Sequence, residues 1–113
     1  MANPSEVPRG NVSGNWVLAL TLSPASIAPN TTAEQTFTLT GVLLGDYVEV
    51  NKPTAQGGLA IVNSRVSANG VIAIAFGNLT AATITPTSNE AYECAVTRPV
   101  NVSSGAPTLT SIT

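Results

Sequence analysis

The 113-residue sequence contains no histidine, a single cysteine and few charged side chains. Histidine is the usual general base near neutral pH, so its absence excludes the common Ser-His and Cys-His catalytic arrangements. The lone Cys94 cannot form an internal disulfide or a cysteine-based zinc site. These absences predict a protein that is not an enzyme and that uses no metal ion or other cofactor.

Charged residues make up only 9% of the chain, against about 25% in ordinary soluble domains. The net charge of −2 leaves no basic surface for a phosphate backbone, which argues against nucleic acid as a partner. The apolar runs are far shorter than the ~20 residues of a membrane-spanning helix, and no charged-then-apolar leader opens the chain. We therefore expect neither a membrane span nor a cleaved secretory signal.

In place of charge, the chain has 15 threonines and 10 serines, with eight prolines and nine glycines at short intervals. Threonine is branched at Cβ, which favours the pleated surface of a sheet. No window of the sequence shows apolar residues repeating at the spacing of a helix. The pattern predicts an all-β fold, an antiparallel β-sandwich or small barrel of about six to eight strands. We expect an extended N-terminal arm (1–14), a β-sandwich domain (15–100) and a Ser/Thr-rich C-terminal tail (101–113).

Alternating apolar residues predict four strands, each with one buried face. They cover about 16–22, 33–40, 46–50 and 91–98, and the apolar faces contain Trp16, Leu18, Leu20 and Leu22; Phe37 and Leu39; Val48 and Val50; Tyr92, Cys94 and Val96. Trp16 fits a core anchor better than a platform for stacking sugars. Tyr47 and Tyr92 are expected to pack with a solvated hydroxyl.

Asn69-Gly70 predicts a hairpin, for which two registers compete. A two-residue turn would pair Ala68 with Val71. A three-residue loop with a left-handed Gly70 would pair Ser67 with Val71 and Val66 with Ile72. We favour the bulged loop because it gathers the largest apolar set on one face, namely Val62, Val66, Ile72, Ile74 and Phe76.

Few side chains are placed for chemistry. Cys94 is expected to be a buried structural thiol. Asp46 and Glu49, like Glu90 and Glu93, are three apart on a strand, so each pair points to opposite faces and cannot act together. Glycosylation motifs begin at four asparagines, and we attribute them to composition: Asn11, Asn30, Asn78 and Asn101.

The four cations, Arg9, Lys52, Arg65 and Arg98, are too scattered for a basic patch. They are expected to be solvated charges, and their special role, if any, is in single salt bridges across an interface. A charge-poor surface lowers the desolvation cost of contact with another protein, so association is the function that this composition favours. The predicted interface residues are Val7, Pro8 and Arg9 of the N-terminal arm, with Lys52 and Arg98, and the C-terminal tail is expected to contribute.

The segment from Thr36 to Pro99 resembles a β-domain found in structural proteins of tailed bacteriophages, namely head decoration (cement) proteins and some fibre or spike proteins. The residues that show the resemblance are strand and turn positions: Thr38–Gly41, Gly45–Pro53, Gly58-Leu59, Val66–Ile72, Phe76–Thr80, Ala81-Ala82, Ile84–Pro86 and Arg98-Pro99. It spans a little over half of the chain and brings no catalytic signature.

The resemblance implies a virion structural role, often as a trimer. We therefore expect a decoration protein, made in the host cytoplasm, that sits on the capsid surface as a homotrimer. Its partner would be the major capsid protein, with no small-molecule substrate. A tail- or head-fibre domain for host attachment is the alternative, and a carbohydrate-binding module is the third.

Overall fold

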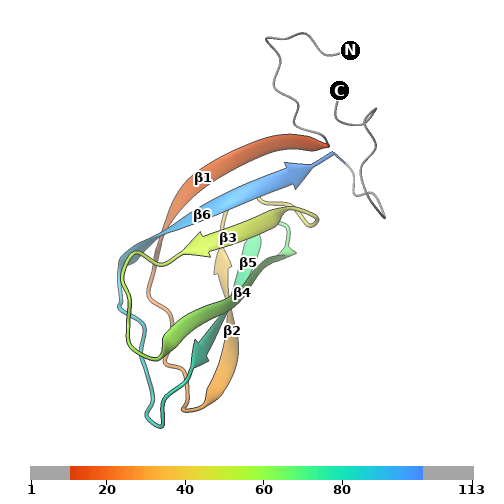
Figure 1. Cartoon of the computed structure of the whole chain (residues 1–113). Helices are drawn as coiled ribbons and strands as arrows, with labels where there is room; N and C mark the ends of the chain where they lie inside the picture. Colours follow the sequence, from red (N-terminus) through yellow and green to blue (C-terminus); the bar gives the residue numbers. More distant parts are fainter. Residues whose placement is uncertain (1–10, 101–113) are drawn as a thin grey trace, which may run out of the picture.

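The computed structural model describes residues 11–100, which form two facing sheets of three antiparallel strands (Figure 1). The strand orders are β1-β6-β3 and β2-β5-β4. The strands are β1 (Val12–Leu22), β2 (Thr31–Thr38), β3 (Tyr47–Asn51), β4 (Leu59–Ala68), β5 (Val71–Asn78) and β6 (Glu90–Pro99). The predicted antiparallel β-sandwich is confirmed.

The central strand of each sheet supplies the middle of the core. On β6, Tyr92, Cys94 and Val96 are buried while the residues between them face outward, as the alternation predicts. On β5 the residues facing the other sheet, Ile72, Ile74 and Phe76, have no exposed surface. Packing these apolar faces together is the main force that holds the two sheets.

The outer face of β5 is built from small residues. Ala73, Ala75 and Gly77 alternate with the core residues, and the Glu34–Arg65 ion pair (2.7 Å) joins β2 to β4 across this strand. Larger side chains on β5 would obstruct that contact. Because both partners are exposed, the pair adds little to stability.

The hairpin between β4 and β5 combines features of both predicted registers. Gly70 has a left-handed φ of 77° and Val66 pairs with Ile72, as the bulged loop requires. The predicted pairing of Ser67 with Val71 was wrong, because Ala68 lies opposite Val71 and the irregularity falls between Val66 and Ala68.

Val62 was also placed on the wrong face. The β4–β5 register shifts a second time between Ile61 and Asn63. An extra residue in one strand moves the side chains of the preceding residues to the opposite face of the sheet. Val62 is therefore 54% exposed, and Ile61 packs against the core instead.

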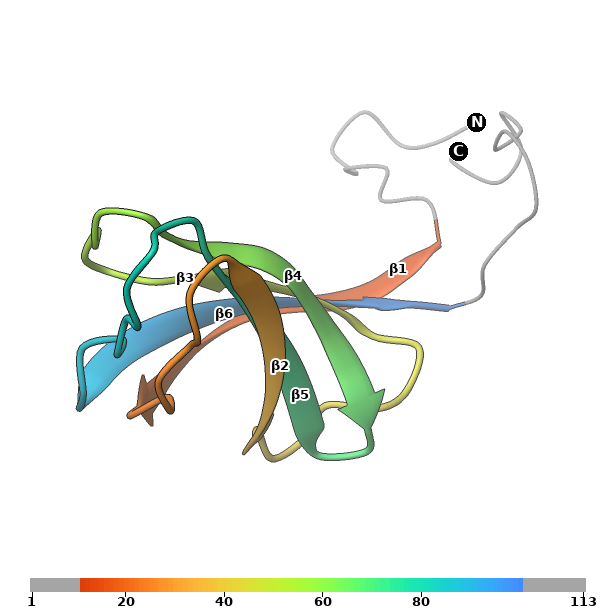
Figure 2. The ribbon, with the colours of Figure 1, turned by 90° about the horizontal axis from the view of Figure 1, so that it is seen from below.

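β1 begins at Val12, inside the stretch expected to be an extended arm, while residues 1–10 and the tail 101–113 lie outside the described residues. β1 and β6 run past the second sheet, whose strands cross them obliquely (Figure 2). The first half of β1 therefore lacks a covering sheet. Trp16, expected to be a core anchor, is 42% exposed for this reason.

Candidate contact surface

The turn between β2 and β3, residues 39–46, presents apolar side chains to the outside. Leu39 and Val42 are buried and anchor the turn in the core, whereas Leu43 and Leu44 are exposed. The two leucines lie between Gly41 and Gly45, both of which have positive φ. An exposed pair of leucines in a tight turn has no role in this sandwich's own core.

The turn is held by the hairpin at the start of β5. Leu39 donates its N–H to the carbonyl of Gly70 (2.9 Å), and the Gly70 N–H donates to the carbonyl of Val42 (2.8 Å). The N–H of Leu44 donates to Asn69 Oδ1 (2.9 Å). The exposed leucines therefore stand on a fixed backbone, which lowers the entropy that would be lost on binding.

A nearly buried carboxylate, Asp46, fixes the other side of the turn. It accepts hydrogen bonds from Arg98 Nε (2.9 Å), Arg98 Nη2 (2.8 Å) and the N–H of Leu43 (2.9 Å). Arg98 Nη2 also donates to the carbonyl of Gly41 (2.9 Å). The Arg98 guanidinium holds the pKa of Asp46 below its usual range, with the Leu43 N–H acting in the same direction against the opposing effect of burial.

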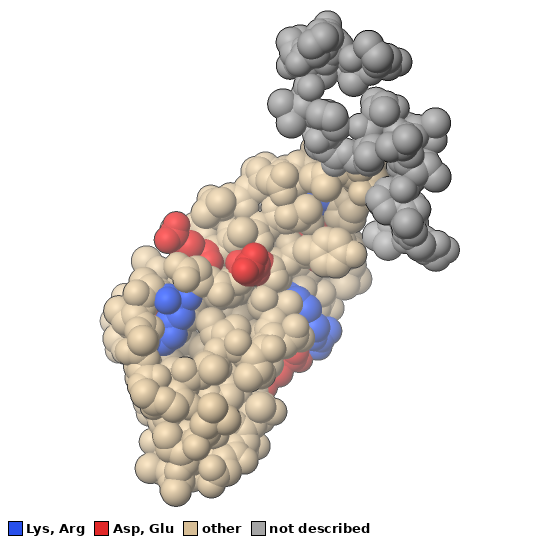
Figure 3. Space-filling model, in the orientation of Figure 1, with Lys and Arg blue, Asp and Glu red and all other residues tan. Residues whose placement is uncertain are grey.

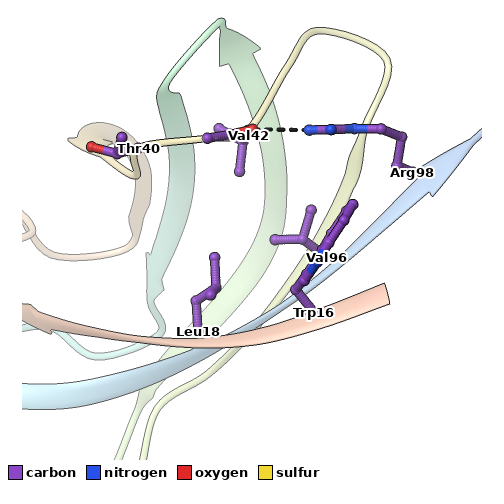
Figure 4. A pocket seen from close by; sticks show the side chains of 7 residues that line it. Trp16, Leu18, Thr40, Val42, Val96 and Arg98 are labelled. Carbon is purple, nitrogen blue, oxygen red and sulfur yellow. Dashed lines mark hydrogen bonds between the residues drawn. The ribbon is translucent and has the colours of Figure 1, made fainter. Parts of the chain in front are cut away.

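Arg98 also forms the wall of an apolar pocket of about 210 Å³ (Figure 4). Its guanidinium carbon lies 5.0 Å from the centroid of the Trp16 ring, a cation–π contact. The rest of the lining is mainly apolar: Leu18, Thr40, Gly41, Val42 and Val96. The pocket opens where β1 and β6 extend beyond the second sheet.

We call Trp16, Leu43, Leu44 and Val100, with the Asp46–Arg98 pair between them, the apolar end. All four apolar side chains are exposed, and Arg98 lines both the Trp16 pocket and a second hollow with Leu43, Leu44 and Val100. Charges are sparse on the face shown in Figure 3. Exposed apolar groups around one internally neutralised ion pair are typical of a protein-contact surface.

The Asp46–Arg98 pair makes the free energy of unfolding depend on pH. A carboxylate with a lowered pKa stabilises the folded state fully above its unfolded-state pKa, about 3.9. That stabilisation is lost as the pH falls through the folded-state pKa. We expect Asp46→Asn to lower the free energy of unfolding by about 2 kcal/mol at pH 7, since hydrogen bonds to a charged group are removed.

Urea unfolding at pH 7 and pH 3, followed by fluorescence of Trp16, the only tryptophan, measures this effect. The difference between wild type and Asp46→Asn should shrink at pH 3. Glu49→Gln is the control, because that carboxylate is exposed on the outer face of β3. An equal loss of stability at both pH values would show that the charge of Asp46 is not responsible.

The structure describes two of the five predicted interface residues. Lys52 Nζ lies 2.9 Å from Glu90 Oε1, and both side chains are nearly buried. Arg98 is paired with Asp46 as described above. Both cations are neutralised within the chain, so neither offers a free charge to a partner. Val7, Pro8 and Arg9 lie outside the described residues.

The candidate carboxylate pairs do not converge in residues 11–100. Asp46 is buried and Glu49 exposed, and Glu90 is buried and Glu93 exposed, so neither carboxylate pair converges. Thr54 Oγ1 donates to Glu90, and with Lys52 it lowers the pKa of that carboxyl. No cluster of three or more acidic or cysteine side chains is placed to hold a metal in this range. The same residues contain no helical segment with the length and hydrophobicity of a membrane span.

Two side chains of β6 have buried titratable groups. Cys94 is buried, as predicted, and burial raises the pKa of its thiol. The Tyr92 hydroxyl is buried and finds no hydrogen-bond partner among the described residues, so the expected solvated hydroxyl was wrong for this tyrosine. Burial, and then the charge of Glu90, raises the pKa of Tyr92 to about 12. Tyr47, in contrast, is exposed on the outer face of β3.

Sequence reasoning missed the leucines of the apolar end. Leu43 and Leu44 fell in a turn between glycines, and turns are usually polar, so this departure was the available signal. Asn69 was interpreted only as a hairpin residue, although its side chain also fixes Leu44. Its role needs a contact 25 residues away in the sequence, which no local pattern contains.

The comparisons with known proteins add no relative: no family model, no curated protein and no solved structure matches this chain.

Proposed function

We propose that this protein is a virion structural protein, a capsid decoration protein that binds the outer surface of the shell. The observation that supports this most is the apolar end, where Leu43 and Leu44 are exposed on a turn held by hydrogen bonds to the Asn69-Gly70 hairpin and to Arg98 of β6. A rigid, largely uncharged contact surface suits a binding protein better than a catalyst. The resemblance of the strands and turns to a phage structural domain is the reason for proposing a capsid as the partner.

The mechanism is adhesion without chemistry. Leu43 and Leu44 lose water when they meet an apolar surface of the major capsid protein, at about 25 cal/mol per Å² of area removed from water. Little charge has to be desolvated, because Arg98 is already paired with Asp46 within the chain. Many copies on neighbouring capsid subunits add weak contacts through effective concentration, which stabilises the shell.

The exposed indole of Trp16 gives the carbohydrate-binding module one observation in its favour. Aromatic rings in sugar sites stack on the ligand with an open face. Here the Arg98 guanidinium lies over the ring, and the rest of the pocket is mainly apolar. Binding to a glycan array that disappears in Trp16→Ala, with an unchanged circular dichroism spectrum, would favour this function over decoration.

Location on the particle tests the proposal. The full 113-residue chain, labelled with gold, is added to virions of the phage whose genome encodes it, and the particles are viewed by negative-stain microscopy. Even coverage of the head is the expected result. Label confined to the tail or to head fibres would instead support the host-attachment domain. Particles without label, both as purified and after the native protein has been stripped off, would overturn a virion role.

A further inference from the structure

Strand β1 has an unprotected edge. Among residues 11–100 it pairs with β6 on one side only, although it is eleven residues long. It contains no charged residue and no proline, and the sequence from 10 to 33 is uncharged throughout. Natural edge strands are usually kept from pairing by charges, prolines or bulges, and β1 has only one irregularity, between Val12 and Gly14.

The core-facing side of β1 is also incompletely covered. Trp16, Leu18 and Leu20 face the core, but Trp16 is exposed and the two leucines are only partly buried. Along the opposite edge the sandwich is closed, because β3 packs against β4 and Ser64 Oγ donates to the carbonyl of Val48 (2.8 Å). Of the other described strands, only β6 makes extensive contacts with β1.

We propose that β1 pairs with β1 of a second copy, antiparallel and about a twofold axis at Val17. The two three-stranded sheets would then join into one six-stranded sheet, β3-β6-β1-β1-β6-β3. Val17 is the middle residue of β1, so this register pairs the strand over its whole length. A twofold interface uses the same surface of both copies, which makes self-complementarity the decisive requirement.

β1 meets that requirement on its core-facing side. About Val17, Trp16 lies opposite Leu18 of the second copy, and Gly14 lies opposite Leu20. The Trp16 indole extends over Gly14, where an added Cβ would lie only 2.7 Å from the ring. The second copy's Leu18 and Leu20 would therefore both approach the exposed indole. Twofold pairing would thus continue the row of apolar residues on the core-facing side of β1 into the second copy.

The outer side of β1 is compatible as well. Val17 is 70% exposed and would meet its own counterpart at the axis, while Asn15 would face Ala19. Like charges opposite one another destabilise paired strands, and β1 brings none to this interface. The uncharged sequence that leaves the edge unprotected is therefore what permits it to pair with itself.

This inference does not depend on the capsid role, and it gives a dimer where the phage resemblance implies a trimer. Each dimer would cover Trp16 but present two copies of Leu43 and Leu44, which increases the avidity of any partner contact. The masses of the two assemblies differ enough to be separated by light scattering.

The test is the solution mass of the full chain by size-exclusion chromatography with light scattering. Wild type is expected to be a dimer. Val17→Lys places two lysines at the axis and should give a monomer. Val62→Lys is the matched control, since Val62 is an exposed valine on the edge strand β4, and it should stay dimeric. Circular dichroism checks that each variant is folded.

A charge-rescue experiment tests whether the two copies of residue 17 lie opposite each other. Val17→Glu alone should also be monomeric, and mixing it with Val17→Lys should restore the dimer mass. A wild-type monomer at about 100 µM, where an interface with a Kd of about 10 µM would be mostly paired, would overturn the proposal. So would a dimer or trimer that survives Val17→Lys, or a mixture of folded variants that stays monomeric.

Discussion

Asn78→Ala is expected to lower the free energy of unfolding by about 3 kcal/mol, although it removes only one small polar group. Asn78 is the last residue of β5 and is only 1% exposed. Truncating this buried amide removes all of its hydrogen bonds, and the Thr80 N–H loses its acceptor. A loss of this size is a large part of the 5–15 kcal/mol that stabilises an ordinary domain.

The Asn78 amide hydrogen-bonds to two loops, the one between β1 and β2 and the one between β5 and β6. Both lie at the end of the sandwich away from Leu44. Its Nδ2 donates to the carbonyls of Ile27 (3.1 Å) and Ala82 (2.7 Å). Its Oδ1 accepts from the Thr80 N–H (2.9 Å) and the Thr80 hydroxyl (2.8 Å). Ile27 in turn forms a two-way backbone bridge with Ile84, so the amide supports the segment that closes this end.

Urea unfolding of Asn78→Ala beside Asn63→Ala measures this contribution. Asn63 is exposed on β4, so its replacement should change stability by less than about 0.5 kcal/mol. If Asn78→Ala unfolds at the same urea concentration as Asn63→Ala, the network adds no net stability.

The burial of Asn78 also supports the view that its glycosylation motif reflects composition, since a buried amide is inaccessible in the folded protein.

The strands were predictable because their signals are local. Alternation at period two is a property of neighbouring residues, and it identified the faces of β3 and β6, where Val48, Tyr92, Cys94 and Val96 are buried. Bulges break that alternation without a mark in the sequence. For this reason Val62 was assigned to the wrong face, while the glycine at position 70 revealed the hairpin itself.

The contact surface was less predictable because it depends on how the two sheets overlap. Trp16 continues the alternation of Leu18 and Leu20, so the sequence could only suggest a buried residue. Its exposure follows from the length of β1 relative to the second sheet. Lys52 and Arg98 were expected to be available for partners because their carboxylate partners are 38 and 52 residues away, beyond any local pattern.

Leu44→Glu is expected to weaken binding to the capsid by about 100-fold, the second large effect that the structure predicts. The side chain is 63% exposed, so the substitution should leave folding intact. The N–H of residue 44 can still donate to Asn69. On the particle, however, the carboxylate would be buried against an apolar surface without a partner, which costs several kcal/mol.

Leu79→Glu is the matched control. Leu79 is 78% exposed and follows β5, so it lies at the end of the sandwich away from the turn at 39–46. The same change of residue type therefore tests position alone. Both variants should have the urea midpoint and circular dichroism spectrum of the wild type.

Co-sedimentation of wild type, Leu44→Glu and Leu79→Glu with virions stripped of their native copies compares the affinities directly. We expect wild type and Leu79→Glu to saturate the head at the same concentration and Leu44→Glu to need about 100 times more. Equal binding by all three proteins would contradict the assignment of the apolar end as the contact surface.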